Sequence, residues 1–151
     1  MLQLLFIYFG LPILFKIYWS DLTSILITFV INYTAYLIEI FRGGMNAIKP
    51  GQFEACQVLG LSNTQTYWKV IIPQTMKKVL PSIANESITL IKDTALVTVI
   101  GVADVMFNTK LYVSQNVTLI PYIVAAIVYL FLSYFIVFVF KKIEKRYSFY
   151  N

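Results

Sequence analysis

Four long apolar stretches constrain the fold of this chain of 151 residues more than any other feature. They cover residues 2–19, 22–41, 82–103 and 118–140. A helix of about 20 residues crosses a hydrocarbon core about 30 Å thick, and each stretch approaches or meets that length. The sequence therefore predicts an all-α polytopic membrane protein with about four transmembrane helices in a single domain, residues 1–151.

Composition agrees with a membrane location. The chain is 59% hydrophobic and 13% charged, whereas soluble domains are about 45–50% apolar and about 25% charged. This leaves no room for a separate soluble catalytic domain. Cys56 is the only cysteine and histidine is absent, which excludes an internal disulfide and a Cys/His metal cluster. We expect Cys56 to be a small packing residue and the chain to hold no metal.

Basic residues predict the orientation of the spans. Segment 42–81 carries five of them and the C-terminal tail four, whereas the two short opposite loops carry Lys110 alone. Cytoplasmic loops are enriched in Lys and Arg. We therefore expect segment 42–81 and the C-terminus to be cytoplasmic, and residues 104–117 to be external. The net charge of +5 follows this pattern and does not indicate a nucleic-acid partner.

Segment 42–81 has its own helix signals. Pro50 suits the first turn of a helix, residues 52–59 can continue it, and Gly60 is placed to end it. Ser62 followed by Gln65 is a capping-box pattern, which predicts a second helix.

Prolines are expected to interrupt other helices. Pro12 predicts a kink in the first span, and Lys16 near the end of that span can reach the interface. Pro73 and Pro81 are expected to break the chain after the second helix into short pieces.

The spacing of one motif resembles a known signature. Glu54-Ala55-Cys56, then Gly60, then Val70-Ile71-Ile72-Pro73 is similar to the loop of membrane permease subunits of binding-protein-dependent ABC importers. That loop reads Glu-Ala-Ala, three residues, Gly, nine residues, Ile-x-Leu-Pro. The spacing matches throughout, with mild replacements at Cys56, Val70 and Ile72.

The flanking residues resemble the polar amino-acid permease branch of this family. The matching segments are Glu39–Gly44, Gly51–Gln52, Asn85–Thr94, Val99–Val102 and Gln3–Pro12. Such permeases have about five membrane helices, and one or more of them precede the segment that matches Gln3–Pro12. The resemblance therefore leads us to expect an N-terminally truncated chain.

The resemblance implies a permease subunit that is not an enzyme, in the cytoplasmic membrane of a bacterium. Its implied partners are an ABC ATPase subunit, a second permease copy or paralogue, an extracytoplasmic solute-binding protein, membrane lipid and an amino-acid substrate. The chain has no phosphate-binding loop of the Gly-x-x-x-x-Gly-Lys-Ser/Thr type. No cofactor is expected in this chain, and ATP and Mg are expected on the ATPase.

The same residues suggest how the loop would couple to an ATPase. Glu54 lies near the positive end of a helix dipole and can pair with a basic residue of a partner. Ala55 permits close approach, and Gly60 lets the chain reverse. The coupling residues predicted are Gly51, Glu54, Ala55, Cys56, Gly60 and Pro73. The alternative is an amphipathic hairpin, residues 51–72, lying on the lipid headgroups.

A polar stripe on the third span predicts a path for solute. At about 100° per residue, one face of this helix carries Ser82, Asn85, Glu86, Thr89, Lys92 and Asp93. The path residues predicted are Asn85, Glu86, Thr89, Lys92, Asp93 and Thr94. Ionisable groups in a span cost about 2.5–3.5 kcal/mol each on insertion scales, so they usually face the protein interior and serve function. Asp93 or Glu86 would meet a substrate ammonium, and Lys92 a carboxylate.

Alternatives remain open at this point. Lys92 and Asp93 could instead pair with neighbouring helices, and Glu39 and Arg42 are expected to pair simply with each other. The cargo could be another small solute, such as an osmolyte, opine or peptide. The chain could also be a truncated membrane remnant that does not transport, and an intramembrane enzyme is the weakest alternative.

Overall fold

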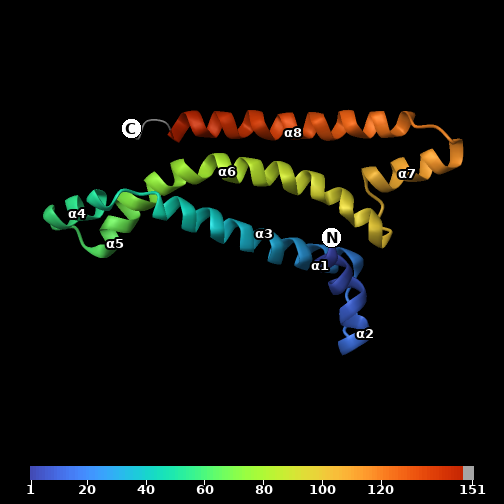
Figure 1. The fold of residues 1–151 in the computed structure, drawn as a ribbon, viewed down its shortest axis with the longest axis horizontal. Coiled ribbons are helices and arrows are strands. Elements are labelled where there is room, and N and C mark those ends of the chain that lie inside the picture. Colours follow the sequence, from blue (N-terminus) through green and yellow to red (C-terminus); the bar gives the residue numbers. More distant parts are fainter. Residues whose placement is uncertain (148–151) are drawn as a thin grey trace. The chain divides into compact units, whose positions relative to one another are not determined.

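The computed structural model describes residues 1–147, and this part of the chain is mostly helical and contains no strand (Figure 1). The predicted all-α fold is therefore confirmed; the end of the predicted domain, residues 148–151, lies outside the described residues. The elements are α1 (Leu2–Leu5), η1 (Phe6–Gly10), α2 (Leu11–Phe15), α3 (Asp21–Asn46), α4 (Pro50–Val58), α5 (Asn63–Thr66), η2 (Tyr67–Ile71), α6 (Ile72–Asp93), η3 (Thr94–Ile100), α7 (Val105–Asn116) and α8 (Ile120–Tyr147).

The chain divides into two compact units. The first comprises Met1–Thr34 and Ser87–Phe135, and the second comprises Ala35–Glu86 and the chain from Ile136 onward. Helices α3, α6 and α8 each contribute residues to both units. Each unit is described by itself below.

Among residues 1–147, two helices are long and apolar enough to cross a membrane. They are Asp21–Asn46, with 26 residues, and Ile120–Arg146, with 27 residues. The predicted span 22–41 falls within the first helix, and the predicted span 118–140 begins two residues before the second. The limits of the predicted spans and of the single domain stay predictions.

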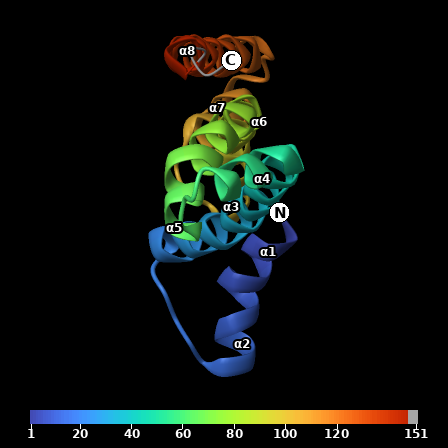
Figure 2. The same ribbon diagram turned by 90° about the vertical axis from the view of Figure 1, so that its left-hand side faces the viewer.

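The N-terminal helix is shorter than the sequence suggests. It runs from Leu2 to Phe15 and ends at Lys16, which is left-handed with φ 56° and whose N–H donates to Pro12 O at 3.1 Å. The chain between Phe15 and Asp21 is not helical and returns to the start of α3 (Figure 2). The apolar run continues to residue 19, so hydropathy alone did not reveal this end.

The expectation that Pro73 and Pro81 break the chain is wrong. Helix α6 begins at Ile72 and continues through Pro81 to Asp93. A proline inside a helix removes one backbone hydrogen bond. Packing offsets that loss here, because Val79 and Leu80, directly before Pro81, are 2% and 7% exposed.

Two prolines follow wide helical turns in the same register. Residues Phe6–Gly10 and Tyr67–Ile71 are π-helical, and Pro12 and Pro73 each lie two residues after these segments. A proline ring clashes with the carbonyl four residues earlier. A π-turn widens the backbone at that position and is a known site of helix distortion. We infer that the π-turns allow both helices to continue through proline.

The core of the first unit joins three elements. Leu4 of α1, Ile25 of α3, and Val97 and Ile100 of η3 form a buried cluster. Helix α6 is followed directly by the 3-10 helix η3, which begins at Thr94 and ends before Gly101. In lipid, such clusters are stabilised by close packing more than by a hydrophobic driving force between helices.

A helix occupies most of the segment predicted as the external loop, residues 104–117. Helix α7 begins after Asp104, whose carboxylate accepts a hydrogen bond from the Phe107 N–H at 2.7 Å. Asp is a preferred residue at this capping position. Asp104 is therefore a sequence signal for the start of a helix, which the charge of the segment alone does not reveal.

Candidate functional site: a helical hairpin and a polar helix face

The structure forms a helical hairpin at residues 50–71, in the second unit, where the signature motif lies (Figure 1). Pro50 occupies the first turn of α4, as predicted. Gly60 is left-handed, with φ 72°, and follows the C-cap Leu59. The Leu61 and Gly60 N–H groups donate to the carbonyls of Cys56 and Gln57, each at 3.0 Å. These two bonds define a Schellman motif, so the predicted helix end at Gly60 is confirmed.

The predicted capping box is also confirmed. The Ser62 hydroxyl accepts from the Gln65 N–H at 3.3 Å, and the Gln65 side chain accepts from the Ser62 N–H at 3.0 Å. Across the hairpin, the rings of Phe53 and Tyr67 lie edge to face with centroids 6.1 Å apart. Local signals fix both helices, and an aromatic pair holds α4 beside η2.

The outer surface of the hairpin combines one carboxylate with large apolar side chains. Gly51, Glu54 and Ala55 are exposed. Val58 and Leu59 near the turn are 88% and 75% exposed, and Trp68 is 68% exposed. Exposed apolar groups of this kind beside a charge are typical of a binding surface.

Cys56 of α4 is buried, unlike these exposed residues. It is 3% exposed and is a free thiol. The prediction that it is a small packing residue is therefore confirmed. Pro73, the last of the predicted coupling residues, lies apart from the hairpin turn at the start of α6.

Three contacts attach α6 to the elements before it in the second unit. The Gln74 side-chain N–H donates to the side-chain amide oxygen of Gln52 at 2.9 Å, and the Lys78 ammonium donates to the backbone carbonyl of Ala47. A side chain on Gly44 of α3 would lie 2.2 Å from a methyl group of Val79. The helices are therefore in close contact at Gly44. The sequence did not single out Gln74 or Lys78, because their partners are 22 and 31 positions away and no local pattern links them.

The polar face of α6 is open where the path was predicted. Asn85, Thr89 and Lys92 are exposed, and Glu86 is half-buried. Thr94 is exposed, and its hydroxyl donates to the Ile91 carbonyl at 2.6 Å. Asn85 and Glu86 belong to the second unit, and the other predicted path residues belong to the first.

Asp93 has a partner that the sequence did not reveal. In the first unit, the Tyr33 hydroxyl of α3 donates to an Asp93 carboxylate oxygen at 2.9 Å. The two residues are separated by 60 positions in sequence. This bond supports the alternative in which Asp93 fixes helix packing. A carboxylate can accept several hydrogen bonds, so the same group could also bind a cation.

The expected pairing of Glu39 with Arg42 is confirmed. The guanidinium nitrogen and the carboxylate oxygen are 2.7 Å apart, and both side chains are largely exposed. Exposed pairs three positions apart on a helix contribute little to stability. They are therefore a local feature of α3 and not part of the site.

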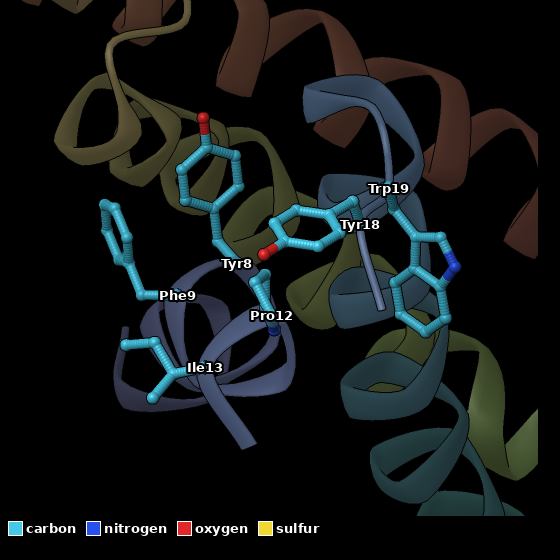
Figure 3. A pocket seen from close by; sticks show the side chains of 6 residues that line it. All are labelled: Tyr8, Phe9, Pro12, Ile13, Tyr18 and Trp19. Carbon is cyan, nitrogen blue, oxygen red and sulfur yellow. The ribbon is translucent and has the colours of Figure 1, made fainter. Parts of the chain in front are cut away.

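An aromatic cavity near the N-terminus was not predicted as a site. It encloses about 390 Å³, and Figure 3 shows the six side chains around it. Tyr8, Phe9, Pro12 and Ile13 come from the helix Leu2–Phe15, and Tyr18 and Trp19 come from the segment that follows. The Tyr8 hydroxyl donates to Asp21 at 3.0 Å. Tyr and Trp are enriched at membrane interfaces, which accounts for these residues at the end of an apolar helix.

Comparisons with known proteins identify the same family that the motif from Glu54 to Pro73 resembles. The family described as "Binding-protein-dependent transport system inner membrane component" matches residues 1–149. The chain is 38% identical over 148 residues to the Arginine transport system permease protein ArtQ of Bacillus subtilis, covering 96% of this chain and 67% of that protein. It is 36% identical over 146 residues to the Glutamine transport system permease protein GlnP of Escherichia coli, covering 95% of this chain and 67% of that protein.

One solved structure has the same fold. It is titled "Crystal structure of an amino acid ABC transporter with histidines" and is 36% identical, with a TM-score of 0.86 over 96% of this chain and 68% of that chain. The chain thus spans about two thirds of the length of the proteins that it resembles. The match over residues 1–149 shows that the chain belongs to the family of inner-membrane components of binding-protein-dependent transport systems.

Proposed function

We propose that this chain is the transmembrane subunit of an ATP-driven ABC importer that moves polar amino acids across the cytoplasmic membrane. The observation that carries the proposal is the exposed hairpin with the complete signature spacing, Glu54 to Pro73, in a chain of this family. The names of the relatives support amino-acid cargo, since they are described as arginine and glutamine permeases.

The hairpin would dock on an ATPase subunit in the cytoplasm, and that subunit would bind ATP and Mg. Glu54 is exposed in the middle of α4, beyond the first turn where the helix dipole acts, and its carboxylate can pair with a basic partner residue. Val58 and Leu59 supply apolar contacts. A cavity of about 570 Å³, with Phe53 and Tyr67 in its wall, lies beside α4 and could receive a partner side chain.

The polar face of α6 would line the solute path. Asp93 offers a carboxylate for the ammonium group of an amino acid, and the exposed Lys92 offers a cation for its carboxylate. An amino acid carries both charges, so opposite charges in one water-excluding path suit it. A second permease copy or paralogue would supply the facing wall, and lipid would surround the pair.

Solute would arrive from outside on an extracytoplasmic binding protein at the side of residues 104–117, with the C-terminus in the cytoplasm. Transport would then proceed by alternating access, a rigid-body switch of membrane helices that follows movement of the ATPase. No bond is made or broken within this chain.

The proposal is tested by reconstitution. The chain, its ATPase, the second permease subunit and the binding protein are placed in liposomes, and uptake of radiolabelled arginine and glutamine is measured with ATP inside. We expect uptake of one of them that depends on ATP and on the binding protein. A complex that assembles but takes up neither amino acid would contradict amino-acid cargo. A chain that never associates with the ATPase would contradict the coupling role.

A further inference from the structure

Two polar contacts on one face of α6 tie it to the hairpin and to the turn that precedes the hairpin. Gln74 donates to Gln52 of α4 at 2.9 Å, and Lys78 donates to the Ala47 carbonyl, in the turn between α3 and α4. Gln74 and Lys78 are four residues apart, and residues at this spacing are neighbours on a helix surface. One face of α6 therefore contacts both the docking helix and the turn that leads into it.

The contact of Lys78 has an electrostatic basis. Ala47 follows the last helical residue of α3, Asn46. The last carbonyls of a helix lack partners within the helix and carry partial negative charge. A lysine ammonium is stabilised at that end, so Lys78 fixes the end of α3 to α6.

The same face leads to the predicted solute path. Along α6, Ser82 follows Lys78 by four residues and Asn85 follows by three more, which keeps all of them within about a quarter of a turn. Helix α6 is continuous over this length, including Pro81. Within the second unit, α6 thus carries the contacts of Gln74 and Lys78 at its start and the predicted path residues Asn85 and Glu86 further along.

Close packing beside these contacts would transmit movement with little loss. Thr75 and Val79, each next in sequence to one of the two polar residues, are 2% exposed and lie against Gly44 of α3. Packed interfaces of this kind move between discrete arrangements and do not deform continuously. Displacement of α4 would therefore move α6 as a body.

We propose that Gln74 and Lys78 are positioning residues that couple movement of the hairpin to the polar face of α6. The inference rests on the proposed function, because it assigns these two residues to the step between docking of the ATPase and opening of the path. Neither residue belongs to the signature spacing that suggested the hairpin's role.

The test measures transport and ATP hydrolysis together in the reconstituted complex. Gln52→Ala, Gln74→Ala and Lys78→Met are each expected to lower uptake per ATP hydrolysed by about five-fold or more, the lower range of coupling between sites. Co-purification with the ATPase should remain, because Glu54, Val58 and Leu59 of the docking surface are unchanged. The matched control is Gln57→Ala, which removes the same type of exposed side chain from α4 without removing a contact to α6.

Restored contacts provide the decisive readout. The paired variant Gln52→Glu with Gln74→Lys replaces the hydrogen bond by an ion pair and should restore uptake per ATP to within about two-fold of wild type, whereas each single change should not. Lys78→Arg should likewise restore coupling. If the alanine variants fail to insert, the paired variant must recover insertion and uptake together.

Three results would overturn the inference: wild-type coupling in Gln74→Ala and Lys78→Met, equal losses in Gln57→Ala, or no recovery in the paired variant. If the wild-type complex assembles and transports, and these variants keep the wild-type uptake per ATP hydrolysed, only the positioning role is rejected. A wild-type complex that neither binds the ATPase nor transports rejects the proposed function itself.

Discussion

The hairpin and the polar face of α6 differ in what determines their structure. The hairpin is fixed by neighbours in sequence: Pro50 begins α4, Gly60 ends it, and Ser62 with Gln65 begins α5. The polar face depends on distant residues, such as Tyr33 for Asp93. The hairpin is thus complete in this chain and offers its outer surface to a partner, whereas the face of α6 takes part of its geometry from other helices.

The largest effect is expected at the end of α4. Gly60→Trp places a bulky residue at φ 72°, a conformation that costs an ordinary residue about 1–2 kcal/mol, and directly at the turn. We expect loss of ATPase co-purification with normal membrane insertion. Gly60→Asn is the control, because Asn tolerates the left-handed conformation, and it should retain most of the association. Normal co-purification of Gly60→Trp would remove the turn from the docking surface.

Removal of a charge separates the two roles of Asp93. Asp93→Asn keeps an oxygen that can accept from the Tyr33 hydroxyl but loses the negative charge. A hydrogen bond to a charged group contributes about 1.5–3 kcal/mol, so uptake should fall by about ten-fold or more while the complex assembles. Tyr33→Phe is the companion variant, which removes the donor and retains the charge. Unchanged uptake in Asp93→Asn, with loss of stability in Tyr33→Phe, would assign Asp93 to packing alone.

Adjacent glycines of α3 provide a matched pair for packing against α6. Gly44→Ala creates a contact at 2.2 Å with Val79, whereas a methyl group on Gly43 meets nothing within 4 Å. Overpacking destabilises by about 1–3 kcal/mol, while Ala in place of Gly favours a helix by about 1 kcal/mol. Thermal unfolding in detergent should show Gly44→Ala less stable and Gly43→Ala equal to or above wild type. Equal stability of the two variants would contradict close packing at Gly44.

The smallest effect concerns the start of α5. Ser62→Ala removes the side-chain acceptor of the capping box, which should destabilise this short helix by about 1 kcal/mol. Hydrogen exchange of the Gln65 amide should become faster by about five-fold, with no change in α3. An unchanged exchange rate at Gln65 would mean that tertiary contacts, such as Phe53 with Tyr67, hold α5 without its cap.

The fold was predictable where a local pattern decides it. Hydropathy located α3 and α8, and turn chemistry located both ends of α4. The expected break at Pro81 was wrong because it was judged from proline alone, whereas packing around Val79 keeps α6 continuous. Hydropathy did not reveal that the first helix ends at Phe15, before the left-handed Lys16.

The candidate site divides in the same way. Spacing identified the signature residues and the polar stripe, since both follow a regular helical period. The contacts that position the site were not predictable. Tyr33, Gln74 and Lys78 each bond to a residue that is distant in sequence, and no local pattern indicates these pairs. The side of the membrane on which the hairpin lies remains a prediction from charge.

The most direct measurement asks where the outer surface of α4 lies and what it touches. A cysteine replaces the exposed Glu54 in a chain whose buried Cys56 is changed to serine, and the whole complex is treated with an impermeant thiol reagent and a thiol crosslinker in sealed vesicles of both orientations. We predict labelling only when the cytoplasmic side faces outward, and a crosslink to the ATPase subunit. Labelling from the external side, without a crosslink to the ATPase, would contradict the account.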